Sequence, residues 1–216
     1  MTTAASVFPV LGLRVTAGPL ELCGITDDLL AGLGDLAVAG IHDPDAMPFF
    51  VPWSTAPAEE LPRNLARYHW GVRSRFAPET WSLELAVLWE GELVGVQGIS
   101  TKDYLVTRTG ETGSWLGRAH QGRGIGTVMR QVFCAFLFDH LDAAEVTSAA
   151  FTDNPASLAV SRKVGYRENG VRRVVRRPGE LAVVQELVLA PEDLVRYQEP
   201  LEVTGVAGVR DLVGLA

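Results

Sequence analysis

Three glycines at alternate positions, Gly122, Gly124 and Gly126, restrict the fold of this chain more than any other feature. They separate an apolar run that ends near residue 116 from a strongly amphipathic stretch. Glycine costs a helix about 1 kcal/mol relative to alanine, so the chain gives up stability where a helix begins. Glycine also permits positive φ and close approach to the backbone, and the free N–H groups of a helix N-terminus suit an anion such as pyrophosphate. We therefore predict a strand, a phosphate-binding turn and a helix.

The helix after the glycines has one apolar face, with the spacing of a helix that packs on a sheet: Ile125, Val128, Met129, Val132, Phe133, Phe136, Leu137 and Leu141. Period-two and helical patterns elsewhere predict further elements. The expected strands cover residues 11–22, 110–116, 145–151, 167–177 and 181–189, together with a hairpin over 82–100. The expected helices cover residues 27–39 after the N-cap Thr26, 59–76, 124–141 and 155–164. Strands and helices without regular alternation indicate the α+β class.

Composition narrows the function classes. The net charge of −7 argues against binding nucleic acid by bulk electrostatics, and no apolar run is long enough for a membrane span. Cys23 and Cys134 are too far apart for a metal cluster and indicate reduced thiols. We expect a cytoplasmic protein without a metal, and one domain over residues 1–216 with a core at about 10–190 and a tail at 191–216.

The glycines do not complete either of two well-known phosphate motifs. Thr127 stands where the dinucleotide fingerprint needs its third glycine, and no Gly-Lys-Ser/Thr follows. The run from Gln121 to Gly126 reads Q-x-x-G-x-G, which resembles the acyl-CoA pyrophosphate loop of the GNAT N-acetyltransferase superfamily. Residues 111–117, ETGSWLG, resemble a strand of its RimJ/RimL-like branch, and NPAS at 154–157 with KVGY at 163–166 resemble later motifs of that branch.

The resemblance implies a mixed, mostly antiparallel sheet of six to seven strands, with helices on both faces and a splay between the fourth and fifth strands. It places the pantetheine arm of an acyl-CoA in that splay and the pyrophosphate on the glycine loop. Acetyl-CoA is the expected co-substrate, with succinyl-CoA as an alternative. The cofactor-binding residues that it implies are Ser114, Trp115, Leu116, Gly117, Gln121, Gly122, Arg123, Gly124, Ile125, Gly126, Thr127, Asn154 and Ser157.

The resemblance also implies direct transfer of the acyl group to a primary amine, which needs a base for the amine proton and help for the departing thiolate. Glu111 is the predicted base, and a water chain is the alternative. Ser157 is the predicted helper of the thiolate, since Ser161 stands where many family members have a tyrosine.

The acceptor is left open between a small-molecule amine and a protein N-terminus. We expect the loop at 43–56, with Phe49, Phe50 and Trp53, to decide it. Homodimers are common among relatives, so the resemblance is compatible with one here. A non-catalytic acyl-CoA-binding module is the competing class, because the usual tyrosine is missing.

Overall fold

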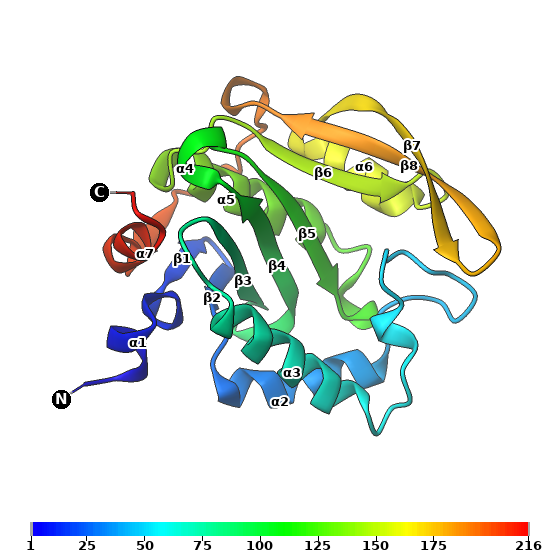
Figure 1. The fold of residues 1–216 in the computed structure, drawn as a ribbon, viewed down its shortest axis with the longest axis horizontal. Coiled ribbons are helices and arrows are strands. Elements are labelled where there is room, and N and C mark those ends of the chain that lie inside the picture. Colours follow the sequence, from blue (N-terminus) through cyan, green and yellow to red (C-terminus); the bar gives the residue numbers. More distant parts are fainter. Residues whose placement is uncertain (1, 216) are drawn as a thin grey trace.

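Strands from both ends of the chain share one sheet in the computed structural model, which describes residues 2–215 (Figure 1). The sheet has nine strands in the order β7-β8-β6-β5-β4-β3-β2-β1-β9. Neighbouring strands are antiparallel except for β5 and β6, which run parallel. The strands are β1 (Arg14–Ala17), β2 (Leu20–Gly24), β3 (Thr80–Trp89), β4 (Glu92–Lys102), β5 (Gly110–Leu116), β6 (Val146–Phe151), β7 (Arg167–Arg177), β8 (Glu180–Leu189) and β9 (Glu202–Thr204).

The expected count of six to seven strands is wrong for two reasons. Residues 11–22 do not form one strand, because the chain turns at Gly18, where φ is +55°, and β1 and β2 pair as a hairpin. Leu11 lies before them in a 3₁₀ turn, Pro9–Gly12. The second addition comes from the tail, where β9 pairs with β1 and extends the sheet by one strand. Three residues that pair with a strand almost two hundred positions away leave little signal in a local pattern.

The helices cover both faces of the sheet. They are α1 (Ala4–Val7), α2 (Asp27–Ala39), α3 (Leu61–Ser74), α4 (Tyr104–Thr107), α5 (Ile125–His140), α6 (Pro155–Val164) and α7 (Val206–Val213). Leu83, Leu85 and Val87 of β3 pack in one apolar cluster with α5, whereas Ala86 of the same strand packs in a second cluster with α2 and α3. The alternation therefore gives the sheet two covered faces, as expected. No helix within residues 2–215 has the length and hydrophobicity that a membrane crossing requires.

Short-range signals place most helix ends correctly. The Thr26 side chain accepts a hydrogen bond from the Leu29 N–H, which confirms it as the N-cap of α2. Within α3, Tyr68 is half exposed and the neighbouring His69 is buried. The Tyr68 hydroxyl bonds to Glu84 on β3.

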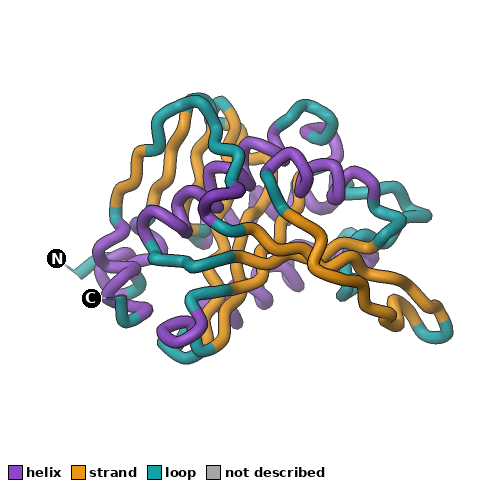
Figure 2. Tube along the Cα trace, turned by 90° about the horizontal axis from the view of Figure 1, so that it is seen from above, coloured by secondary structure: helices purple, strands orange, loops and turns teal. Residues whose placement is uncertain are grey.

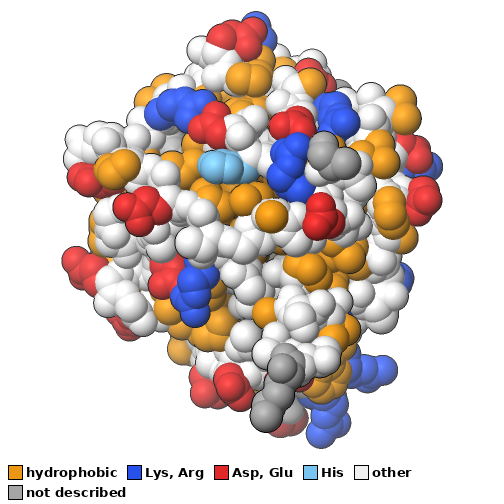
Figure 3. All heavy atoms as spheres, turned by 90° about the vertical axis from the view of Figure 1, so that its left-hand side faces the viewer, with side chains coloured by type: hydrophobic (Ala, Val, Ile, Leu, Met, Phe, Trp, Pro, Cys, Tyr) orange, Lys and Arg blue, Asp and Glu red, His pale blue; other side chains and the backbone are white. Residues whose placement is uncertain are grey.

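The two long β-strands at the end of the sheet project away from the helices. In two perpendicular views the β7–β8 hairpin extends at the end of the molecule opposite the chain termini (Figures 1 and 2). The face that carries the termini shows acidic and basic side chains interspersed rather than gathered in a patch of one sign (Figure 3). The predicted splay lies between these regions, at the junction of β5 and β6.

Candidate active site

The turn before α5 combines positive φ angles with open space. Gly122 and Gly124 have φ of +73° and +85°, values that residues other than glycine rarely adopt. A Cβ at either position would meet nothing within 4 Å, so the space beside the turn is free for a ligand. Gly126 differs, since its φ is helical and an added Cβ would lie in ordinary contact, 3.7 Å from Leu116 and Val160. The first two glycines therefore shape the predicted phosphate cradle.

Main-chain N–H groups at the start of α5 point from this turn. Gly124 is the N-cap of α5 and makes no side-chain cap, so the helix begins at Ile125 without a capping group. The Thr127 N–H already donates to the Gly124 carbonyl at 3.0 Å. The predicted anion contacts therefore concentrate on the amides from Gly122 to Gly126. The Arg123 side chain is exposed beside them.

Gln121 secures the turn rather than facing away from the protein. Its Nε2 donates to the carbonyls of Leu116, at 2.9 Å, and of Ile41. These bonds tie the end of β5 to the segment after α2. Gly117 lies in the same junction, where a Cβ would come within 2.3 Å of Leu36. Both predicted cofactor residues thus have a clear part in holding the loop in place.

The edge of β5 is open over the residues that were predicted to pair with pantetheine. β5 and β6 are paired only at Glu111 and Thr147, and the two strands diverge beyond that pair (Figure 1). Ser114, Trp115 and Leu116 keep their partners on β4 and have none on β6. The splay between the fourth and fifth predicted strands is therefore confirmed as the gap between β5 and β6.

α6 begins at the far side of this gap. Asn154 Oδ1 accepts a hydrogen bond from the Ser157 N–H at 3.1 Å, which makes Asn154 the N-cap. The Ser157 hydroxyl is partly exposed, whereas Ser161, one turn later, is fully buried. The Ser161 hydroxyl donates to the Ser157 carbonyl and accepts a bond from Arg130 of α5. Of the two serines, only Ser157 is left accessible to a ligand.

A loop bridges the two diverging strands. Trp53, in the 3₁₀ turn Trp53–Thr55, packs on Trp115 of β5 with ring centroids 5.6 Å apart. Phe50 of the same loop packs on Phe151 of β6 at 4.9 Å. The loop that was predicted to decide the acceptor therefore spans the gap at its open end.

On the α3 side of the sheet the gap leads to an acidic pocket of about 380 Å³. Glu111 of β5 and Glu84 of β3 line it together with Tyr68 of α3. Its floor is poor in side chains, because Gly98 of β4 pairs directly with Gly113 of β5. A Cβ at Gly98 would come within 2.5 Å of the Glu84 carboxylate, so this glycine makes room for it.

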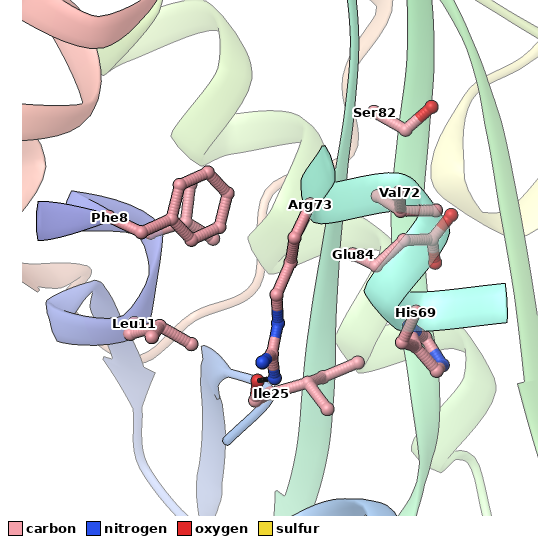
Figure 4. Close-up of a pocket in the computed structure, with 9 residues that line it drawn as sticks. Phe8, Leu11, Ile25, His69, Val72, Arg73, Ser82 and Glu84 are labelled. Carbon is pink, nitrogen blue, oxygen red and sulfur yellow. Dashed lines mark hydrogen bonds between the residues drawn. The ribbon is translucent and has the colours of Figure 1, made fainter. Parts of the chain in front are cut away.

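Glu84 is the more strongly perturbed carboxylate. Burial raises its pKa to about 7, and a hydrogen bond from the Tyr68 hydroxyl, 3.2 Å away, lowers it only in part. Figure 4 shows the opposite side of Glu84, where a cavity of about 20 Å³ lies between α3 and the N-terminal segment at Phe8 and Leu11. His69 faces that cavity, and burial with the Arg73 charge lowers its pKa to about 4. His69 is thus neutral near pH 7 and gives Glu84 no positive partner.

Glu111 is more exposed to solvent than Glu84. Its side chain is exposed at the rim, and its pKa is raised because the surrounding protein removes part of its water. The Glu186 charge raises this pKa further, while Arg172 lowers it. The predicted base therefore shares its pocket with a second carboxylate that is better shielded from water.

Sequence reasoning missed Glu84, Tyr68 and Arg130. Glu84 lies between Leu83 and Leu85 in the hairpin predicted over 82–100, where nothing in the local sequence distinguishes it from an ordinary surface carboxylate. The Glu84 side chain lies on the side of the sheet that α3 covers. The glycine at position 98, which makes room for this side chain, was the signal that the sequence offered. Arg130 lies off the apolar stripe predicted for the helix, where an exposed arginine is usual, yet it is buried.

The structure thus combines a glycine turn with free space beside it, an open strand edge and an acidic pocket. A family model described as an acetyltransferase (GNAT) domain matches residues 29–167. The chain belongs to the GNAT acetyltransferase family.

Individual relatives agree with this assignment. "Putative ribosomal N-acetyltransferase YdaF" of Bacillus subtilis (strain 168) is 30% identical over 91 residues, which are 42% of this chain and 49% of that protein. The match thus spans about half the length of that relative. Among solved structures, Mycobacterium smegmatis RimJ in complex with CoA-disulfide has a TM-score of 0.71 at 20% identity and covers 94% of this chain and 92% of its own. RimL, a ribosomal L7/L12 alpha-N-protein acetyltransferase in complex with coenzyme A, has a TM-score of 0.65 at 18% identity and covers 80% of this chain and 94% of its own. At these identities the two structures support the fold.

Proposed function

We propose that this protein transfers the acetyl group of acetyl-CoA to the N-terminal amine of a protein, by direct attack of the amine on the thioester. The observation that carries the proposal is the open edge of β5, which joins the glycine turn at one end to the acidic pocket at the other. If acetyl-CoA binds with its pyrophosphate at Gly122 and Gly124 and its pantetheine arm along β5, its thioester lies beside Glu84 and Glu111.

The cofactor contacts follow this line. The amides from Gly122 to Gly126 take the pyrophosphate oxygens, since they start a helix and the space beside Gly122 and Gly124 is free. The main chain of Ser114, Trp115 and Leu116 pairs with the pantetheine amides in place of a neighbouring strand. The N–H near Ser114 polarises the thioester carbonyl, an oxyanion-type contribution. The Asn154 side chain reaches the arm from the other side of the gap.

The two carboxylates divide the work on the amine. Glu84 takes the proton, because a base with a pKa of about 7 is half ionised at the pH where it works. Glu111, at the rim, attracts the incoming ammonium and passes it inward. The ammonium first gives one proton to water. The neutral nitrogen then forms its bond to the carbonyl carbon and gives a second proton to Glu84, and the C–S bond breaks with its electron pair on sulfur. The Ser157 hydroxyl hydrogen-bonds the departing thiolate.

A protein N-terminus is the acceptor favoured by the shape and the charge of the pocket. Its mouth is open and acidic, which suits a flexible cationic chain end rather than an anion. Two relatives whose names refer to ribosomal N-acetylation support the same choice. Acetyl-CoA as donor implies work in the cytoplasm, where the coenzyme is made and used.

The decisive experiment measures thiol release from acetyl-CoA with a panel of peptides that differ only at the N-terminal amine. Free peptides should be acetylated, and the same peptides with blocked N-termini should not. Faster turnover with succinyl-CoA would assign the other donor. Tight binding of coenzyme A without turnover on any amine would identify a binding module and refute the enzyme.

A further inference from the structure

Arg130 is a buried arginine between β5 and α6. Its side chain projects from α5, and the residue is 6% exposed. Its two terminal nitrogens donate to Ser161 Oγ at 2.8 Å and to Ser114 Oγ at 3.2 Å. Within residues 2–215 its Nε has no hydrogen-bond partner. Both known contacts are serine hydroxyls rather than carboxylates, so the charge is buried without an opposite charge. Burial of a charge without an opposite charge is destabilising unless something compensates it.

The titratable groups around Arg130 cannot supply that compensation. Tyr166 lies under the guanidinium, with 6.0 Å between Cζ and the ring centroid, and its hydroxyl contacts Cys134 at 3.5 Å. Burial raises the pKa of Cys134 to about 11 and the pKa of Tyr166 well above its usual value. Both therefore stay protonated and uncharged near pH 7. The positive charge of Arg130 can therefore be balanced by an anionic group of a bound ligand.

The cation and the carboxylates lie on opposite faces of β5. Thr112 and Ser114 point to the α5 face, where they bond to Tyr166 and Arg130. Glu111 points to the other face and lines the pocket with Glu84. Along this strand the protein thus places negative charge on the side where an amine enters and positive charge on the far side. Acyl transfer needs the same order, since the attacking nitrogen gains positive charge and the leaving sulfur gains negative charge.

We propose that the Arg130 guanidinium stabilises the thiolate of coenzyme A as it leaves. The inference rests on the proposed function, because it requires pantetheine in the gap between β5 and β6. The C–S bond breaks with its electron pair on sulfur, and Arg130 keeps its proton while it attracts the thiolate. Of the two protons that the ammonium loses, one goes to water before the attack and one remains on Glu84, so the step consumes no further reagent. Ser114 and Ser161 position the guanidinium.

The test titrates the thiol of coenzyme A while it is bound, by the ultraviolet absorption of the thiolate. A cation close to the sulfur should lower the thiol pKa by about 1 to 3 units relative to free coenzyme A. Arg130→Met should return the pKa to the free value or above it, and Arg130→Lys should keep part of the shift. Arg196→Met is the matched control, because Arg196 also bonds to α5, at Asp139, but on the surface. It should behave as the native protein.

Three results would overturn the inference. A bound thiol with the pKa of free coenzyme A in the native protein is one, and an unchanged shift in Arg130→Met is another. The third is a variant whose thiol pKa is unchanged but whose preference between acetyl-CoA and succinyl-CoA is altered, since Arg130 would then read the acyl group. If Arg130→Met fails to fold, Arg130→Lys decides by the size of its shift. Absence of coenzyme A binding in the native protein would instead refute the proposed function itself.

Discussion

The glycine turn and the acidic pocket, which lie at opposite ends of the proposed site along β5, are built from different parts of the amino acid. At the proposed cofactor end, Gly122 and Gly124 offer positive φ angles, empty space and main-chain amides. At the proposed acceptor end, Glu84, Glu111 and Tyr68 offer side chains from three separate elements. A backbone site depends on residues that lack a side chain, whereas the pocket depends on single functional groups. Replacement of one of these glycines should therefore weaken binding of coenzyme A, and loss of a carboxylate should spare binding and slow transfer.

The largest expected effect is on transfer at the acceptor end. Glu84→Gln keeps the shape and removes the base, so kcat should fall by about 100-fold or more while the affinity for coenzyme A stays the same. Steady-state kinetics with a peptide amine and calorimetry with coenzyme A measure the two quantities. Glu79→Gln, an exposed change at the start of the same hairpin, is the control. Equal rates in the two variants would show that Glu84 is not the base.

The pH dependence sharpens this prediction. With a pKa of about 7, Glu84 is protonated in acid, so native transfer should fall about tenfold per pH unit well below 7. Transfer by Glu84→Gln should not show this fall in acid.

The stability of the protein should depend on pH through the same group. The pKa of Glu84 is higher in the folded than in the unfolded protein, so the protonated form stabilises the fold at low pH and this contribution is lost as pH rises through 7. Glu84→Gln should therefore be more stable than the native protein at pH 8, by about 1 to 3 kcal/mol. Thermal unfolding at pH 5 and pH 8 tests this sign.

The next effect breaks the cofactor end. Gly124→Val forces a branched side chain into positive φ and into the space reserved for pyrophosphate, so the affinity for coenzyme A should fall by about 100-fold. Gly179→Val is the matched control, because Gly179 also has positive φ and open space but lies in the β7–β8 turn. Both variants should lose similar stability, and only one should lose coenzyme A, as calorimetry will show. Native affinity in Gly124→Val would contradict the cradle.

The same contrast explains what the sequence could predict. The glycine turn and α5 are contiguous, so their spacing predicted a phosphate-binding turn, and the family resemblance implied the splay. Glu84 is positioned beside Gly98 across a hairpin and beside Tyr68 on a separate helix. No local period in the sequence carries that relation. β9 was missed for a similar reason, because its three residues gain order only by pairing with β1. Features formed by one continuous segment could be predicted from the sequence, whereas features formed by side chains from distant segments could not.

A smaller effect is expected at the rim of the pocket. Glu111→Gln removes a charge that attracts the ammonium but leaves Glu84 in place, so KM for a peptide amine should rise about tenfold with little change in kcat. Because the charge is exposed, added salt should weaken the native enzyme's advantage. Kinetics at low and high ionic strength measure both. A collapse of kcat in Glu111→Gln would return the role of base to Glu111.

The smallest effect belongs to Ser157. Its N–H is held by Asn154 and its carbonyl by Ser161, so the backbone of α6 does not need its hydroxyl. Ser157→Ala should leave the melting temperature unchanged and slow transfer by only about threefold, since the thiolate of coenzyme A leaves readily. Ser161→Ala is the informative counterpart, because it removes a partner of the buried Arg130 and should cost about 1 to 2 kcal/mol of stability. If Ser157→Ala instead slows transfer more than Ser161→Ala, the hydroxyl at 157 rather than the guanidinium carries the thiolate.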